Sequence, residues 1–171
     1  MIANFRMADG APLELEATAD STWDVPICKY GVNLTCFGAA VVLRCKKLHS
    51  AESYGSSSGT EGTASQKCLE DVQSTQAIAT TLGCPPVGPT FIGTDNRANL
   101  LIATGAGQSS RMKHALRRYM VLQQAIRDGH VSMGHIPDEE NPSDFLTKYL
   151  HAKKFAASIE YCTNARNVVS F

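Results

Sequence analysis

A long amphipathic helix in the first half of the chain constrains the possible folds most. Small and apolar residues recur at spacings of three and four over residues 64–82, and the pattern stops at Gly83, as in a helix packed on one face. Before this helix, residues 13–20 alternate apolar and polar side chains, which is typical of a half-buried strand. Residues 32–43 contain enough β-branched and aromatic residues for two antiparallel strands joined by a turn at Gly38. Three strands therefore precede the helix.

The second half of the chain alternates strands and helices. Residues 89–95 predict a short buried strand, and Asn96 can cap a helix over residues 97–103. A second long helix is expected over residues 109–127, followed by a strand over residues 131–136. Because a helix between strands returns the chain to the same sheet, this order predicts a mixed α/β layer architecture with an antiparallel start.

The 171 residues, of which 43% are hydrophobic, suit one globular domain with a sizeable core. We expect residues 1–12 to be a lead-in or linker, residues 13–155 to be the folded domain and residues 156–171 to be a tail. The longest apolar runs, such as residues 37–43, are too short to span a bilayer, and residues 1–10 lack the core of a signal peptide. An intracellular protein without a membrane partner is therefore expected.

Charge is balanced over the whole chain and uneven along it. Sixteen basic and sixteen acidic residues leave no net charge, so contact with nucleic acid must come from a local patch. Basic residues at helical spacing in the second long helix form either a solvated face or a track for a phosphate backbone. They are Arg111, Lys113, Arg117, Arg118 and Arg127. The six cysteines lack the spacing of zinc ligands and are interpreted as reduced thiols.

A candidate site lies in residues 130–149. Asn141 and Pro142 suit the cap and first turn of a new helix, which would place Asp144 in that turn. There the helix dipole favours the carboxylate anion, which can bind a divalent cation, and His135 could reach the same place. The alternative is a surface carboxylate that merely complements the dipole.

Four acidic residues stand at the ends of expected elements. They are Asp20, Glu61, Asp95 and Asp144. Hydrolysis of a phosphodiester needs an activated water and a stabilised leaving oxygen, and two cations about 4 Å apart serve both. Magnesium prefers oxygen ligands, so clustered carboxylates suit this chemistry and Cys or His does not.

Several short motifs resemble the ribonuclease H domain of copia-type retrotransposon polyproteins over roughly residues 13–155. In chain order they are Asp20-Ser-Thr-Trp23, Lys46-Lys47, Ser58-Gly-Thr-Glu61, Thr94-Asp95-Asn96, Ser110-Arg-Met-Lys-His114 with Arg118-Tyr119, and Asn141-Pro-Ser-Asp-Phe-Leu-Thr-Lys148. The resemblance implies an α/β RNase H-like fold, with a five-stranded mixed sheet flanked by helices. It also implies two Mg²⁺ ions, for which Mn²⁺ can substitute, and cleavage of the RNA strand of RNA–DNA hybrids.

By motif, Asp20, Asp95 and Asp144 match the three aspartates of the family's site, and Glu61 matches the glutamate of its first helix. Glu52 is a rival match for that glutamate. All four acids would then be metal ligands and catalytic residues. His135, in a Gly-His-Ile-Pro context that resembles the family's mobile histidine, would shuttle a proton or assist product release; a surface histidine without a role is the alternative.

The resemblance further implies the partners. The hybrid's wide minor groove with its 2′-hydroxyls would meet Asn96 and Arg97, and Arg111, Lys113, Arg117 and Arg118 would grip backbone phosphates. A reverse transcriptase domain is expected in the same polyprotein, the domain itself is expected to be monomeric, and the location would be cytoplasmic, in a virus-like particle, or nuclear.

Two alternatives stay open. One is a decayed module that binds a duplex without cleaving it, which fits Thr22 where the family has a second Asp and the glycines Gly59 and Gly62 around Glu61. The other is a non-nuclease α/β domain, which scattered carboxylates would favour.

Overall fold

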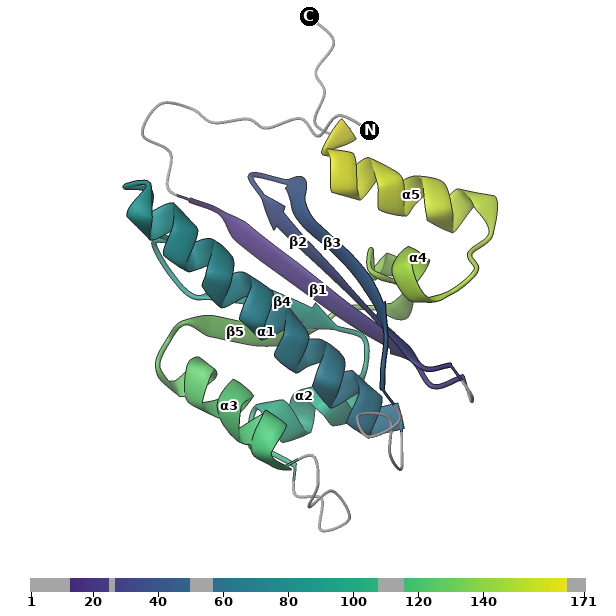
Figure 1. Ribbon diagram of the computed structural model, residues 1–171. Coiled ribbons are helices and arrows are strands. Elements are labelled where there is room, and N and C mark those ends of the chain that lie inside the picture. Colours follow the sequence, from purple (N-terminus) through teal and green to yellow (C-terminus); the bar gives the residue numbers. More distant parts are fainter. Residues whose placement is uncertain (1–12, 25–26, 50–56, 108–115, 166–171) are drawn as a thin grey trace, which may run out of the picture.

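Five strands form one mixed sheet in the order β3-β2-β1-β4-β5 in the computed structural model, which describes residues 13–24, 27–49, 57–107 and 116–165 (Figure 1). The strands are β1 (Leu15–Thr22), β2 (Lys29–Cys36), β3 (Ala39–Lys47), β4 (Thr90–Thr94) and β5 (Val131–His135). β1, β2 and β3 are antiparallel neighbours, whereas β1, β4 and β5 run parallel. The expected mixed sheet of five strands is confirmed.

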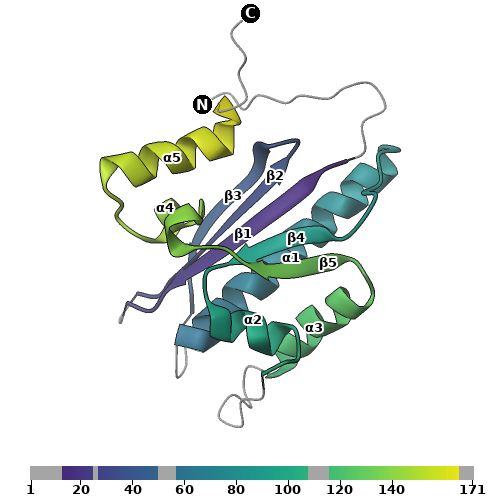
Figure 2. The same cartoon turned by 180° about the vertical axis from the view of Figure 1, so that it is seen from behind.

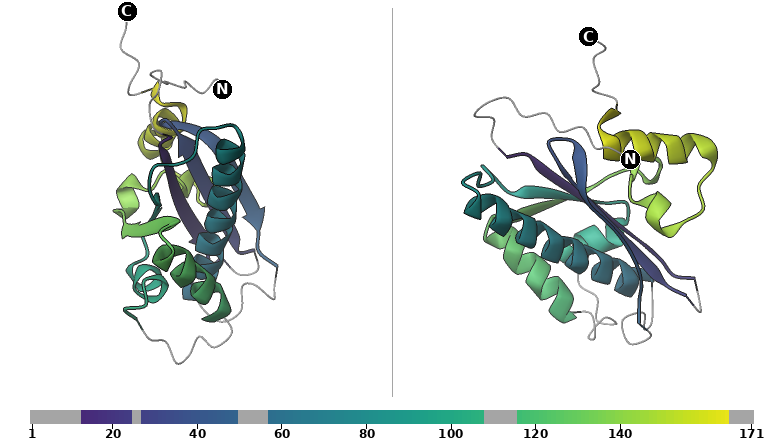
Figure 3. Two further views of the ribbon diagram at one scale, coloured as in Figure 1. Left: turned by 90° about the vertical axis from the view of Figure 1, so that its left-hand side faces the viewer. Right: turned by 45° about the horizontal axis from the view of Figure 1, so that its top comes forward.

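Helices cover both faces of the sheet. They are α1 (Ser57–Thr81), α2 (Arg97–Ala103), α3 (Leu116–Arg127), α4 (Asp144–Thr147) and α5 (Ala152–Thr163), with a 3₁₀ turn η1 at Asp138–Glu140. α1 crosses in front of the strands in Figure 1 and behind them in Figure 2, where α4 lies on the viewer's side. Figure 3 shows α1 and α3 side by side, away from α4 and α5. No helix in the described ranges is long and apolar enough to cross a membrane.

β1 is the central strand and is buried on both faces. Every β1 residue except Glu16 is buried, so the expectation of a half-buried strand is wrong. Ala17 and Ala19 belong to the hydrophobic core, which α1 covers, and the alternation of side chains directs Thr18 and Asp20 to the face that carries α4. Polar and apolar side chains alternate along β1 because one face packs against the apolar core and the other packs against buried polar groups rather than water.

The hairpin between β2 and β3 turns at the predicted position. Phe37 and Gly38 both have positive φ angles, 50° and 77°, as in the tight turns whose twist suits antiparallel strands. Asn164, the C-cap of α5, donates a hydrogen bond from Nδ2 to the carbonyl oxygen of Phe37 (3.1 Å). α5 therefore packs on the sheet, and residue 155, the expected end of the domain, lies in the first turn of this helix.

Helix ends follow local signals where such signals exist. The long first helix stops before Gly83, whose φ of 82° is the left-handed conformation that ends many helices. Asn96 caps α2, and its side chain accepts a hydrogen bond from the backbone N–H of Asn99 (3.0 Å), so this predicted cap is confirmed.

Candidate active site

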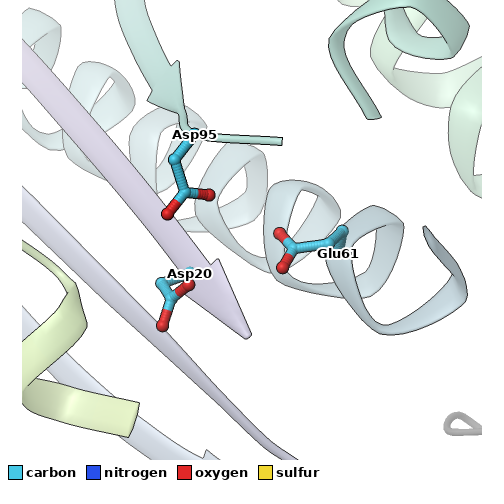
Figure 4. A group of neighbouring side chains, drawn as sticks. All are labelled: Asp20, Glu61 and Asp95. Carbon is cyan, nitrogen blue, oxygen red and sulfur yellow. The ribbon is translucent and has the colours of Figure 1, made fainter. Parts of the chain in front are cut away.

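Three carboxylates converge at the carboxyl ends of the neighbouring parallel strands β1 and β4. Asp20 lies near the end of β1, Asp95 follows β4 directly, and Glu61 lies near the start of α1. One oxygen from each lies within 4.8 Å of the others, and Figure 4 shows the three side chains pointing toward one another. Ser21 fixes Glu61 at the end of β1, because its hydroxyl donates to Oε1 of Glu61 (2.8 Å).

A second acidic group shares Asp95 with the first. Oxygens of Asp95, Asp138 and Asp144 also lie within 4.8 Å of one another. Asp144 is buried, whereas Asp138, in η1, is exposed. Sequence reasoning missed Asp138, and the only local signal was the acidic run that follows Pro137.

The segment before α4 differs from the expected helix cap. The helix begins at Asp144, and Asn141 is not its N-cap. Oδ1 of Asn141 accepts from the backbone N–H of Ser143 (3.0 Å), and its Nδ2 donates to Oδ2 of Asp95 (3.3 Å). The expected cap is wrong because Oδ1, the atom that would cap the helix, accepts instead from Ser143 in the turn before it, and Nδ2 links this turn to Asp95. The helix dipole of this four-residue helix is also too small to account for the buried Asp144.

Two lysines offset the negative charge of Asp144. Oδ1 lies 3.1 Å from Nζ of Lys148, and Oδ2 makes a close ion pair with Nζ of Lys154. Lys148 also lies 3.3 Å from Oδ1 of Asp20, whose other oxygen accepts a close hydrogen bond from the hydroxyl of Thr147. Thr147 and Lys148 belong to a motif that the sequence revealed, but their contacts with Asp20 were not predicted, and no signal marked Lys154.

The environment raises the pKa values of all three converging carboxyls. Burial, followed by the charge of Asp20, raises the pKa of Glu61 to about 8. Burial raises the pKa of Asp20 to about 6, against the hydrogen bond from Thr147 and the charge of Lys148. Burial also raises the pKa of Asp95. Protons or cations must therefore offset charge that burial disfavours.

The converging carboxylates fit a hard divalent cation. Oε2 of Glu61 is buried and has no hydrogen-bond partner among the residues that the structure describes. A buried carboxylate oxygen without a partner is costly unless a proton or a cation satisfies it. Asp20, Glu61 and Asp95 together offer the oxygen donors that Mg²⁺ and Mn²⁺ prefer.

The remaining predicted site residues lie around this cluster or outside the described residues. His135 is exposed at the end of β5 and pairs in register with Thr94, one residue before Asp95. Asn96 and Arg97 follow Asp95 directly, and Arg97 is exposed. On α3, Arg117 is exposed and Arg118 is half-buried. Glu52, Arg111 and Lys113 lie outside the described residues.

Gly62 has a packing role beside Glu61. A Cβ atom at Gly62 would lie 2.8 Å from the ring and hydroxyl of Tyr119, so glycine allows α3 to pack closely on α1. The Tyr119 hydroxyl donates to Oδ1 of Asn99 (2.9 Å), and Nδ2 of Asn99 donates to Oγ of Ser65 (2.8 Å). Packing against Tyr119 therefore accounts for Gly62, and this glycine is not evidence for a decayed module.

The strand order, the helices on both faces and the acids at the ends of β1 and β4 define the RNase H-like fold. Solved structures agree. LC11-RNase H1, determined in complex with an RNA/DNA hybrid, matches with a TM-score of 0.62 at 14% identity, over 78% of this chain and 93% of that one. RNase H1 from the archaeon Halobacterium salinarum matches with a TM-score of 0.57 at 19% identity, over 78% and 93%. The N-terminal RNase H domain of Rv2228c from Mycobacterium tuberculosis matches with a TM-score of 0.53 at 14% identity, over 90% and 98%.

Comparison by sequence finds no relatives. No family model matches the chain. No curated protein matches it either. The fold is therefore shown by structure alone.

Proposed function

We propose that this chain is a metal-dependent endoribonuclease that cleaves the RNA strand of RNA–DNA hybrids. The observation that carries the proposal is the convergence of Asp20, Glu61 and Asp95 within 4.8 Å at the ends of β1 and β4. The fold neighbour determined with an RNA/DNA hybrid supports this class of substrate. Two-metal hydrolysis of phosphodiesters uses such a cluster of hard oxygen ligands.

The acids of the site hold two cations in this proposal. Asp20, Glu61 and Asp95 hold the first, and the second uses the group of Asp95, Asp138 and Asp144. Bound divalent cations supply a nucleophilic water and charge stabilisation at the leaving oxygen. Thr147 and Ser21 keep the side chains of Asp20 and Glu61 in place, each through one hydrogen bond. His135, exposed at the same edge of the sheet, moves a proton or assists product release.

Recognition of the hybrid depends on shape and charge. Asn96 and Arg97 follow Asp95 and face the minor groove, where the 2′-hydroxyls distinguish RNA from DNA. Arg117 and Arg118 hold backbone phosphates, together with Arg111 and Lys113. The domain acts as a monomer beside a reverse transcriptase in a copia-type retrotransposon polyprotein, in a cytoplasmic particle or in the nucleus.

A direct test is incubation of the full chain with a hybrid that carries separate labels on its RNA and DNA strands. We expect shortened RNA, intact DNA and dependence on Mg²⁺, with no product in EDTA. The same labelled RNA in an RNA duplex is the matched control, and it should stay uncut. An intact hybrid at every Mg²⁺ concentration would contradict the proposed activity.

A second candidate is a decayed module that binds the hybrid without cleaving it. It is favoured by the two lysines on Asp144, which contact both carboxylate oxygens and compete with a cation. A gel-shift assay beside the cleavage assay on the same hybrid separates the candidates. The decayed module would bind the hybrid in the gel shift and yield no cleavage product with Mg²⁺ or Mn²⁺.

A further inference from the structure

The ammonium group of Lys148 lies between Asp20 and two members of the second acidic group, Asp138 and Asp144. Its Nζ is 3.1 Å from Oδ1 of Asp144, 3.3 Å from Oδ1 of Asp20 and 3.6 Å from Oδ1 of Asp138. An ammonium has three donors and no acceptor, so three carboxylates can surround it as they would surround a cation. Lys148 therefore supplies positive charge at the point where the second acidic group meets Asp20.

Close packing places Lys148 there. α4 lies directly on Gly31, the residue that pairs with Asp20 in β2, and a Cβ atom at Gly31 would be 2.7 Å from Cβ of Leu146. Because α4 approaches so closely, the adjacent Thr147 and Lys148 reach the two oxygens of Asp20. Thr147, the last residue of α4, and Lys148, its C-cap, thus contact both oxygens of Asp20, one acid of the first group.

The two lysines differ in their relation to the first acidic group. Among the acids that the structure describes, Lys154 forms ion pairs with Asp144 and Asp138 only. Its Nζ also donates to the backbone carbonyl of Asp138 (2.7 Å). Lys148 alone bridges Asp20 and Asp144. Its side chain is 35% exposed, so it can leave toward solvent, whereas that of Lys154 is 15% exposed. Lys148 is the lysine that a second cation would have to displace.

We infer that Lys148 holds the place of the second divalent cation in the free protein. The inference rests on the proposed function and deepens it: the chain alone binds one ion, at Asp20, Glu61 and Asp95, and admits the second only when the Lys148 side chain moves away. Lys148 is a positioning residue in the free site. Removal of its ammonium group opens the second position to a metal.

The test counts Mn²⁺ ions bound to the full chain without nucleic acid. Protein stripped with EDTA and dialysed is titrated with Mn²⁺, and free Mn²⁺ is measured by electron paramagnetic resonance. We expect about one ion per chain for the wild type and about two for Lys148→Gln, since Gln keeps much of the side-chain length without the charge. Lys153→Gln removes the same charge from an exposed position on α5 and should bind about one ion, as the wild type does.

Either of two ion counts would overturn the inference. They are two ions bound by the wild type, or equal counts for the wild type and a folded Lys148→Gln variant. If that variant is unfolded without metal, Mn²⁺ must restore its far-UV circular dichroism, because an ion would replace the lost ammonium. A variant that stays unfolded in saturating Mn²⁺ also contradicts the inference.

Cleavage is measured separately. A wild type that binds Mn²⁺ as expected but never cuts the hybrid contradicts the proposed enzyme and leaves the role of Lys148 intact. A wild type that cuts the hybrid, with Lys148→Gln binding the same number of ions, contradicts only the role of Lys148.

Discussion

Replacement of Glu61 by Gln should stabilise the metal-free protein at alkaline pH. The pKa of Glu61 is raised from 4.5 to about 8, mainly by burial and then by Asp20. The stability associated with the neutral carboxyl is therefore fully present below about pH 4.5 and is lost as the pH rises through 8. Gln has nearly the same shape, can accept the same hydrogen bond from Ser21, and does not ionise.

The magnitude follows from the size of the shift. At about 1.4 kcal/mol per pKa unit, a shift from 4.5 to about 8 corresponds to at most about 5 kcal/mol, and the titration of neighbouring Asp20 lowers this limit. We expect the free energies of unfolding of Glu61→Gln and wild type to agree within about 1 kcal/mol near pH 5. Near pH 9 the variant should be more stable by about 2 to 4 kcal/mol.

Urea unfolding in EDTA, followed by circular dichroism across this pH range, measures the difference. Glu70→Gln is the matched control, because Glu70 lies on the same helix in a surface pair with Lys67 (2.9 Å). It should change stability by less than about 1 kcal/mol at either pH. Parallel pH profiles for Glu61→Gln and the wild type would refute the argument that Glu61 is ionised at a cost. Saturating Mg²⁺ should reverse the order at alkaline pH, because the cation stabilises the ionised site and the variant lacks one ligand.

Three further predictions concern other parts of the molecule. Asp95→Asn should reduce hybrid cleavage at least about 100-fold in the strand-labelled assay, with an unchanged circular dichroism spectrum, because it removes a ligand charge and no core volume; near wild-type cleavage would exclude Asp95 as a ligand. Gly62→Ala should lower the free energy of unfolding by about 1 to 3 kcal/mol through collision with Tyr119, and the cost should vanish in a Tyr119→Ala background; equal costs in both backgrounds would exclude the collision. The double variant Arg117→Ala, Arg118→Ala should lower the slope of log binding constant against log salt concentration by the equivalent of about two phosphate contacts. An unchanged slope in a binding titration would show that the hybrid does not contact these arginines.

Features set by a few neighbouring residues could be predicted from the sequence. The turn before β3 needs two residues with positive φ, and Gly38 supplies one of them. Asn96 caps the helix that follows it, and Gly83 follows the end of α1. The order of strands and helices followed from such local signals, and the resemblance to a ribonuclease H domain supplied the arrangement of the sheet.

Features that depend on contacts across the chain could not be predicted. Asn141 is a residue type that often caps helices, but its side chain donates a hydrogen bond to Asp95, 46 positions earlier. Lys154 reaches Asp144 from another helix, and no local pattern marks that contact. The alternation of polar and apolar residues in β1 predicts a strand that faces solvent on one side. In the folded chain Thr18 instead bonds to Ser143, 125 positions away.

The contacts that could not be predicted bring together a group of charged side chains. Five carboxylates gather at the ends of β1 and β4, namely Asp20, Glu61, Asp95, Asp138 and Asp144, and two lysines lie among them. Full ionisation would leave a formal deficit of three positive charges, which one divalent cation reduces to one. In the metal-free site the raised pKa of Glu61 also reduces the deficit, because a proton on this carboxyl removes one negative charge below about pH 8, and a bound cation displaces that proton. With one cation bound and Lys148 in place, the ionised site keeps one negative charge. A second divalent cation would leave an excess of one positive charge unless Lys148 departs, and its departure balances the site.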